Sequence, residues 1–129
     1  MHLSALETVE SWHAAMNARD DDQLCELTAH DVELIGPRGT ARGLKSLRLW
    51  VGRAAYTAQP LRWFCGRQGH VVVEQRGRWT SSEFTDERTV ASAFSVQHGR
   101  VIRYQRFDSL DEALTACELS DDDEVLARA

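Results

Sequence analysis

The amino-acid sequence predicts an α+β domain, in which helices come first and a run of antiparallel strands follows. In the first part of the chain, apolar residues recur every three or four positions, which is the spacing of one face of a helix. From Leu61 onward they alternate with polar residues, which is the period of a strand. Helices that are segregated from strands are typical of α+β domains. Because each helix has only one apolar side, we expect the sheet to form the other wall of the core.

Three helices are expected before the strands. Ser4, followed three residues later by Glu7, predicts a capping box at the start of the first helix. The acidic residues 20–22 favour the start of a second, short helix, because negative charge is stabilised at a helix amino terminus. A short hairpin at residues 32–43 precedes the third helix, whose apolar stripe runs through residues 44–54.

The strands are expected to form a four-stranded meander, with a short helix after it. Gln68-Gly69 and His98-Gly99 are typical of two-residue hairpin turns. We expect the acidic segment 120–129 to be a solvated tail. Since no linker or internal repeat divides the chain, residues 1–129 are expected to form one domain. The expected strands are 61–67, 71–80, 88–97 and 101–108, and the expected helix is 110–119.

Composition and charge exclude several classes of protein. Hydrophobic residues make up 43% of the chain, which is enough for a folded core. Twenty acidic residues against 15 basic ones give a net charge of −5, so nucleic acid is not an expected partner. No apolar run is long enough to span a membrane, and the first residues are not typical of a signal peptide, so we expect a cytoplasmic protein. The cysteines and histidines lack metal-ligand spacing and no phosphate-binding loop is present, so neither a metal nor a cofactor is predicted.

Two segments carry a resemblance to a known superfamily. Residues 12–51 read WHAAMNARDDDQLCELTAHDVELIGPRGTARGLKSLRLWV, and residues 98–114 read HGRVIRYQRFDSLDEAL. The first resembles the helix, short helix, strand, glycine turn and helix of the nuclear-transport-factor-2-like (NTF2-like) superfamily, in particular of its SnoaL-like branch. The second resembles the final strand and terminal helix of the same proteins. In all, the resemblance covers residues 3–119.

The resemblance implies a cystatin-like cone, in which three amino-terminal helices pack on a curved, mostly antiparallel sheet and a short helix ends the chain. It also implies a small-molecule pocket at the open end of the cone and a homodimer formed through the outer face of the sheet. Members of the superfamily include polyketide cyclases, ketosteroid isomerases, dehydratases, epoxide hydrolases and non-catalytic binding subunits. Fold is therefore a firmer expectation than function.

The catalytic groups of the ketosteroid isomerases are missing from the matching positions. Trp12 stands where those enzymes have a tyrosine, and Gly36 stands where they have the general-base aspartate. Ser92 stands near the position of the aspartate of the oxyanion hole. A steroid-isomerase mechanism is therefore not expected.

A different set of polar residues lies on the last expected strand. Tyr104, Arg106 and Asp108 alternate, so they share one face, which the resemblance makes the pocket face. In an apolar pocket Asp108 could act as a general acid or base, while Arg106 and Tyr104 orient the substrate or polarise a carbonyl. The alternative is structural: Arg106 and Asp108 form an ion pair, and Asp108 caps the helix that follows.

Aromatic side chains are candidates for the ligand-binding wall, because their broad apolar faces suit a flat organic ligand. Each of them could equally belong to an ordinary core, and Ser92 could bond to backbone. On the expected strand 71–80, Glu74 and Arg76 share the face opposite Trp79, and we expect this charged pair to point outward. The candidate ligand-binding residues are Trp12, Met16, Trp50, Trp63, Ser92 and Phe94.

Two functions of different classes fit these observations. The first is a protein that binds a small, mostly apolar organic molecule and catalyses proton transfer of the isomerase, cyclase or dehydratase type. The second is a non-catalytic ligand-binding or dimerisation module of the same fold. A pocket sealed by Trp12, Met16, Phe94 and Tyr104, with Asp108 paired outside it, favours the module. An open cavity that exposes Asp108 favours the enzyme or a ligand carrier.

Overall fold

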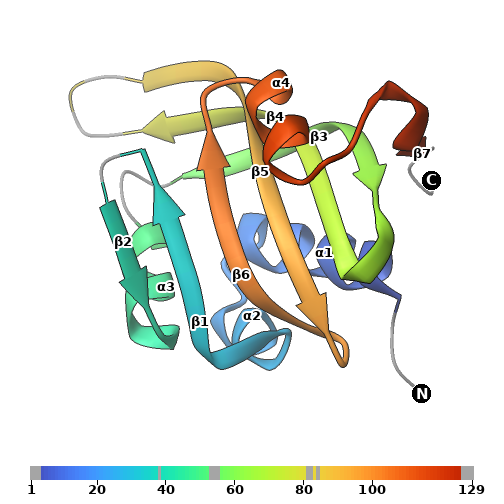
Figure 1. Cartoon of the computed structure of the whole chain (residues 1–129). Helices are drawn as coiled ribbons and strands as arrows, with labels where there is room; N and C mark the ends of the chain where they lie inside the picture. Colours follow the sequence, from blue (N-terminus) through green and yellow to red (C-terminus); the bar gives the residue numbers. More distant parts are fainter. Residues whose placement is uncertain (1–3, 38, 53–55, 81–82, 84, 126–129) are drawn as a thin grey trace.

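The computed structural model describes residues 4–37, 39–52, 56–80, 83 and 85–125. One seven-stranded sheet has helices α1, α2 and α3 on one face and helix α4 on the other (Figure 1). The helices are α1 Ala5–Asn17, α2 Asp21–Glu26, α3 Leu44–Gly52 and α4 Leu110–Ala116. The strands are β1 Thr28–Gly36, β2 Gly39–Arg42, β3 Thr57–Cys65, β4 His70–Thr80, β5 Thr85–Gln97, β6 Arg100–Phe107 and β7 Glu124–Val125.

The strands lie in the order β2-β1-β6-β5-β4-β3-β7, so the expected meander of β3 to β6 is confirmed. Every neighbouring pair is antiparallel except β1 and β6, which run parallel with Leu34 beside Tyr104. The long connection from β1 through β2, α3 and the meander lets the last strand return beside the first one in the same direction. The α+β class that the sequence predicts is therefore confirmed, with one parallel pair in a mostly antiparallel sheet.

Helix α1 begins where the sequence predicts. The Ser4 hydroxyl accepts a hydrogen bond from the Glu7 backbone N–H at 3.1 Å, and the Glu7 carboxylate accepts one from the Ser4 backbone N–H at 3.1 Å. This reciprocal pair satisfies two helix donors that have no partner within the helix. The apolar stripe of α1 then lies on the inner face of the sheet, and its buried members include Val9, Trp12 and Met16.

Strand β3 begins four residues earlier than the sequence predicts. Pro60 lies inside it, and a proline is normally read as the end of a strand because it has no backbone N–H to donate. β7 pairs with β3 only at Trp63 and Phe64, so β3 is an edge strand at Pro60, and the missing donor breaks no ladder there. A shift of register between Pro60 and Arg62 accommodates the proline. Residues 53–55, at the end of the expected third helix, lie outside the described residues.

His98-Gly99 forms the expected two-residue turn between Gln97 and Arg100, whereas Gln68-Gly69 lies within a longer connection, residues 66–69, between β3 and β4. Gln68 and Gly69 have φ values of 63° and 78°, and His98 and Gly99 have φ values of 53° and 74°. Consecutive residues with positive φ give the local twist that matches antiparallel strands. A β-carbon on Gly69 would collide with the Val96 backbone oxygen, so the β3–β4 connection requires glycine for both conformation and space.

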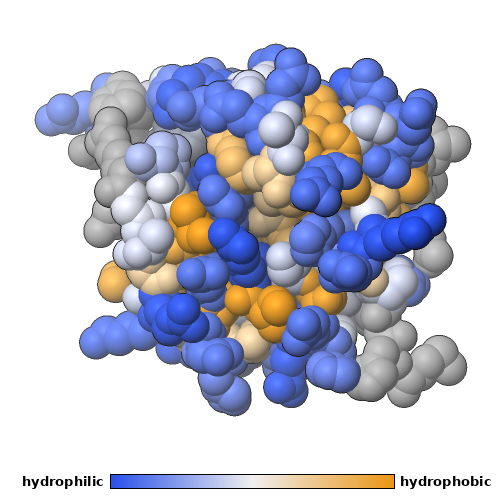
Figure 2. Space-filling model, viewed as in Figure 1, coloured by the Kyte–Doolittle hydropathy of each residue, from blue (hydrophilic) through white to orange (hydrophobic). Residues whose placement is uncertain are grey.

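Apolar side chains are buried on both faces of the sheet. The larger core lies between the sheet and helices α1 to α3, and the smaller one lies beneath α4. In Figure 2, hydrophobic residues gather around α4 on this outer face and are surrounded by hydrophilic ones. The smaller core consists of Phe64, Val72, Ala91, Ala93, Ala113 and Leu114.

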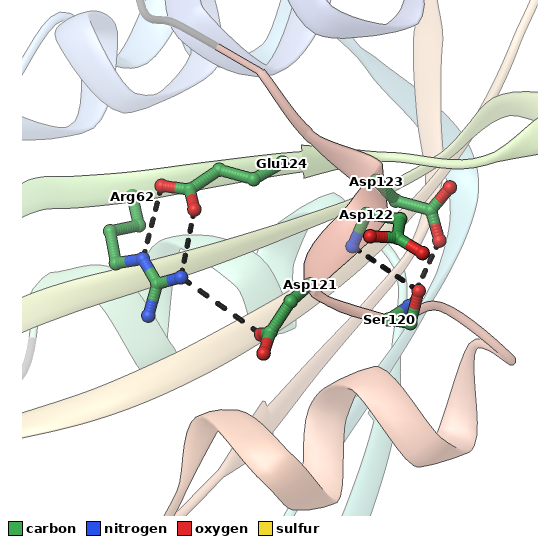
Figure 3. A network of polar contacts seen from close by, with 6 residues as sticks. All are labelled: Arg62, Ser120, Asp121, Asp122, Asp123 and Glu124. Carbon is green, nitrogen blue, oxygen red and sulfur yellow. Dashed lines mark hydrogen bonds and ion pairs between the residues drawn. The ribbon is translucent and has the colours of Figure 1, made fainter.

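The acidic segment after α4 is exposed at residues 120–122 and 124, and as far as residue 125 it also contacts the edge of the sheet, which the sequence did not predict. β7 pairs with the edge of β3, and Val125 packs against the inner core. Arg62 of β3 donates two hydrogen bonds to the Glu124 carboxylate, at 2.8 and 3.0 Å (Figure 3). An uncovered edge strand offers unpaired backbone groups, and a short complementary strand satisfies them. Residues 126–129 lie outside the described residues.

We predict that Gly69→Ala destabilises the fold. A left-handed conformation costs a non-glycine residue about 1–2 kcal/mol, and the collision with Val96 adds to that cost. Gly39→Ala is the matched control, because Gly39 also has a positive φ of 155° but has open space around it. Urea denaturation should show a larger loss of unfolding free energy for Gly69→Ala than for Gly39→Ala. Equal losses would contradict the steric argument.

Candidate functional site

Strand β6 directs two of the predicted residues toward the helices. Tyr104 lies opposite Phe94 of β5, and Arg106 lies opposite Ser92. Tyr104 and Phe94 belong to the inner core, and alternation along the strand places Arg106 and Ser92 on the same face. The four residues therefore line the inner side of the sheet along two neighbouring strands.

The deep part of the inner side is a packed aromatic cluster. The Trp12 ring centroid lies 5.1 Å from that of Phe94 and 5.0 Å from that of Tyr104, and the Phe94 and Tyr104 rings stack at 5.1 Å. The Trp12 side chain is 0% exposed, and its Nε1–H donates to the Thr28 hydroxyl at 3.0 Å. Trp63 and Met16 are buried in the same core. Four of the predicted ligand-binding residues therefore fill the core: Trp12, Met16, Trp63 and Phe94.

A layer of polar groups lies next to this aromatic cluster. The Gln75 Nε2 atom donates to the Tyr56 hydroxyl at 2.9 Å and to the Ser92 hydroxyl at 3.0 Å. The Arg106 Nε–H donates to the Tyr104 hydroxyl at 2.9 Å. The Arg106 guanidinium lies over the Tyr56 ring, with 4.2 Å between its Cζ atom and the ring centroid. We call these five residues the polar cluster: Tyr56, which precedes β3, Gln75 of β4, Ser92 of β5, and Tyr104 and Arg106 of β6.

Two buried atoms of the polar cluster have no hydrogen-bond partner. They are the Arg106 Nη2 atom, which is a donor, and the Gln75 Oε1 atom, which is an acceptor. Gln75 is 0% exposed in the ligand-free chain. A buried polar atom without a partner costs about 1–3 kcal/mol, and more when the group is charged. The polar cluster therefore has one open donor and one open acceptor.

Arg106 retains its charge in this setting. Burial lowers the pKa of its guanidinium, but the charge interactions with Tyr104 and Tyr56 and the hydrogen bond to Tyr104 raise it, and the net shift is upward. Burial raises the pKa of the Tyr56 phenol, as does Tyr104, while Arg106 opposes the shift. Tyr56 is therefore a neutral partner, and no carboxylate of the described residues forms an ion pair with Arg106.

The end of α1 fixes Tyr56 in place. Arg19, in a left-handed conformation, donates through its guanidinium to the backbone oxygens of Val51 and Tyr56, both at 2.6 Å. Asn17 forms a pair of hydrogen bonds with the Ala58 backbone, at 2.8 and 2.9 Å. The segment that leads from α3 into β3 is thus tied to the end of α1 on both sides of Tyr56.

Two tryptophans form the outer wall of the polar cluster. The Arg106 Cζ atom lies 6.0 Å from the Trp50 ring centroid, and the Trp79 ring lies 5.0 Å from the Tyr56 ring. Both tryptophans are half-buried, in contrast to the buried Trp12. Gly77 makes this arrangement possible, because a β-carbon there would come within 2.8 Å of Trp79 and 3.2 Å of Tyr56. Trp50 is therefore the predicted ligand-binding residue that offers an accessible apolar face.

Asp108 lies away from the polar cluster. β6 ends at Phe107, and the Asp108 side chain is exposed, so it lacks the apolar enclosure that its proposed role requires. It does not cap α4 either, because the Ser109 hydroxyl accepts the hydrogen bond from the Glu112 N–H at 3.3 Å. Arg106 instead contacts Tyr104 and Tyr56, so the expected Arg106–Asp108 ion pair is absent from the described residues.

The face of β4 is as the sequence analysis favoured. Val73 belongs to the inner core and Val72 to the outer one, so alternation places Glu74 and Arg76 on the outer face. Arg76 forms an exposed ion pair with Glu87 at 3.4 Å. Glu74 is therefore on the opposite side of the sheet from the polar cluster.

Sequence reasoning missed Gln75 and Tyr56 as members of the site. The signal for Gln75 was present, because it occupies an inward position in line with Val71 and Val73 of the same strand. A polar residue at an apolar position of a strand is a buried polar group that must find partners. Tyr56 gave no comparable signal, since it precedes β3 and is placed by contacts with residues distant in the sequence, among them Arg19 and Gln75.

The outer face carries a separate hollow beside α4. Its volume is about 310 Å³, and it lies on the surface that Figure 2 shows. Arg103 in its lining is paired with Glu33 of β1 at 3.4 Å. Burial raises the pKa of the Cys117 thiol at its edge, and Arg103 opposes that shift. The hollow is lined by His70, Ala93, Ser95, Arg103, Gln105, Ala116 and Cys117.

The described residues lack both a metal-binding cluster and a membrane-spanning helix. They contain no group of three or more His, Cys, Asp or Glu side chains placed to hold a metal ion. None of their helices has the length and apolar character needed to cross a bilayer.

A family model described as "SnoaL-like domain" matches residues 9–104, which is more than half of the chain. The chain therefore belongs to the SnoaL-like domain family, and its fold is that of the NTF2-like proteins. No curated protein matches the sequence.

Solved structures agree with this assignment. Bal32a, from a soil-derived mobile gene cassette, superposes with a TM-score of 0.75 at 22% identity, covering 84% of this chain and 92% of its own. An NTF2-like protein of unknown function from Cytophaga hutchinsonii gives 0.74 at 9% identity, covering 87% and 96%. TerC, co-crystallised with polyporic acid, gives 0.72 at 17% identity, covering 89% and 96%. At these identities the likeness extends to the fold alone.

His13 makes stability depend on pH. It is 2% exposed among the rings of Trp12, Trp63 and Phe94, and neither ring nitrogen has a partner in hydrogen-bonding geometry. Burial lowers its pKa from 6.5 to about 4, and the Ala58 backbone opposes this shift only in part. Because the unfolded chain binds the proton more tightly, the stabilising effect is complete above pH 6.5 and declines as the pH falls to about 4.

We predict that acidification from pH 7 to pH 4 removes up to about 3 kcal/mol of unfolding free energy through His13. His13→Leu, which keeps an apolar side chain of similar size, should flatten this part of the pH profile measured by urea denaturation. His30→Gln is the control, since His30 is exposed, and it should keep the wild-type slope. A His13→Leu profile as steep as the wild-type one would assign the acid sensitivity to other groups.

Proposed function

We propose that this protein binds a small, mostly apolar organic molecule at the open end of the cone, against Trp50 and the polar cluster. The observation that carries the proposal is the pair of buried, unpartnered atoms on Arg106 and Gln75 beside a half-buried aromatic wall. Ligand sites are typically apolar concavities with a few well-placed polar groups. The co-crystallisation of the structurally similar TerC with polyporic acid is consistent with a ligand site in this fold.

The geometry favours a non-catalytic binding module over a proton-transfer enzyme. Trp12, Met16, Phe94 and Tyr104 are buried and close off the deep end of the cone. Asp108 is exposed, and Arg106 and Tyr104 contact each other without it. In this proposal Arg106 and Tyr104 orient the ligand, and Ser92 holds the Gln75 amide in place.

Two further expectations remain predictions. A homodimer formed through the outer face of the sheet would have to include α4, because α4 covers part of that face. The cytoplasmic location also stays an expectation from the sequence.

The first test concerns Trp50. A thermal-shift panel of acetophenone, benzamide, benzoate and 1-tetralone should contain at least one compound that raises the melting temperature of the wild-type protein. Trp50→Ala should weaken the binding of that compound about tenfold, since burial of an aromatic face contributes roughly 1.5–3 kcal/mol. Leu49→Ala is the matched control, because Leu49 lies next to Trp50 on α3 and is 57% exposed. Failure of the whole panel to bind would contradict the proposed function.

The second test concerns Asp108. Asp108→Asn should leave the affinity for the same compound within about twofold of the wild-type value, because an exposed carboxylate contributes little to a site that it does not contact. Nuclear magnetic resonance spectra of the bound compound would detect any chemical conversion. Conversion by the wild-type protein that is lost in Asp108→Asn would restore the catalytic hypothesis.

A further inference from the structure

The two unpartnered atoms of the polar cluster, Arg106 Nη2 and Gln75 Oε1, indicate which chemical groups a ligand would need. We infer that the site takes an organic acid, whose carboxylate or equivalent planar oxyanion accepts hydrogen bonds from the Arg106 guanidinium, and whose neighbouring hydroxyl donates to the Gln75 amide oxygen. This inference rests on the proposed function and adds the chemical class of the ligand. It is argued from the charge on Arg106, the unpartnered Nη2 donor of Arg106 and the unpartnered Oε1 acceptor of Gln75.

Arg106 is a largely buried cation that forms no ion pair with the acidic residues in the described part of the chain. Its guanidinium carries five N–H donors, of which the Nε–H donates to the Tyr104 hydroxyl. One flat face lies on the Tyr56 ring, which stabilises the cation but accepts none of its in-plane hydrogen bonds. An uncompensated buried charge is strongly destabilising, and a bound anion removes that cost. Planar carboxylates match the fork of the guanidinium better than a neutral oxygen does.

The described residues near Arg106 do not supply an anionic partner for its guanidinium. The buried polar side chains of the described residues are Thr8, His13, Thr28, Gln75 and Ser92, and none of them is a carboxylate. The nearest acidic residue along β6, Asp108, is exposed and makes no ion pair with Arg106. The anion that Arg106 lacks is therefore not supplied by the described part of the chain.

Gln75 adds a requirement for a ligand donor. Its Nε2 atom is engaged by Tyr56 and Ser92, which fixes the amide and leaves Oε1 without a partner. Ser92 lies directly opposite Arg106 in the β5–β6 register, and Tyr56 contacts both Arg106 and Gln75. The open donor and the open acceptor thus flank Tyr56, and the structure does not join them to each other. A ligand with an acidic group and a nearby hydroxyl satisfies both atoms at once.

The test compares benzoate with benzamide, which has nearly the same shape but no charge. Titration calorimetry on the whole protein should show benzoate binding about tenfold more tightly or better, as is typical of a charge-assisted hydrogen bond. Arg106→Met should remove this preference, and Arg106→Lys should restore only part of it, because lysine lacks the planar fork. The control is Arg103→Met, three positions away along β6 and on the exposed outer face, which should keep the wild-type preference.

A second readout guards against a variant that does not fold. Removing an unpaired buried charge should leave the melting temperature of ligand-free Arg106→Met equal to or above that of the wild type. A separate experiment tests Gln75 with 3-hydroxybenzoate. The wild-type protein should bind this compound more tightly than benzoate, and Gln75→Met should bind the two with equal affinity.

The outcomes separate the inference from the proposed function. Equal binding of benzamide and benzoate, or undiminished benzoate binding by Arg106→Met, overturns the organic-acid assignment and leaves the proposed function standing. Binding of the neutral compounds alone has the same meaning, and it assigns the open atoms to bound water. Binding by no member of the panel overturns both.

Discussion

The contact between Trp12 and the inner face of the sheet is the constraint on which the rest of the structure depends. Its ring packs on Phe94 of β5 and Tyr104 of β6, so one side chain of α1 joins the first helix to the last two long strands. Its only polar atom is satisfied by Thr28, at the start of β1. The polar cluster lies next to these rings on the inner face of the sheet, where Arg106 contacts both Tyr104 and Trp50.

The polar cluster lowers the stability of the fold and keeps two hydrogen-bonding atoms available. Arg106 and Gln75 each keep a buried atom without a partner, which costs free energy that the aromatic core must offset. Such unsatisfied groups are uncommon in native proteins and are concentrated where a ligand or a reaction accounts for them. The rigid ties from Arg19 and Asn17 to both sides of Tyr56 hold the cluster in one arrangement, so the cost of ordering it does not fall on the binding step.

The outer face of the sheet is covered by different elements from the inner face. α4 covers the middle strands, and β7 covers the edge of β3 with help from the Arg62–Glu124 pair (Figure 3). The acidic residues after α4 therefore have a structural use that charge alone did not indicate. A partner protein approaching this face would meet α4 and the hollow lined by Arg103 and Cys117.

Local signals determined much of the fold. The Ser4–Glu7 capping box, the positive-φ hairpin turns and the alternation along β4 to β6 are properties of neighbouring residues, so the sequence by itself determined the class, the meander and the face that Tyr104 and Arg106 share. The identity of the site depended on contacts between distant residues. Whether Trp12 or Trp50 keeps an exposed face, whether Arg106 pairs with Asp108 or lies on Tyr56, and whether the segment after α4 reaches the edge of β3 are decided only when helices, strands and edges pack. The physical reason is that burial and charge pairing are set by the partners that tertiary structure brings together, whereas caps, turns and periodicity are set by the chain itself.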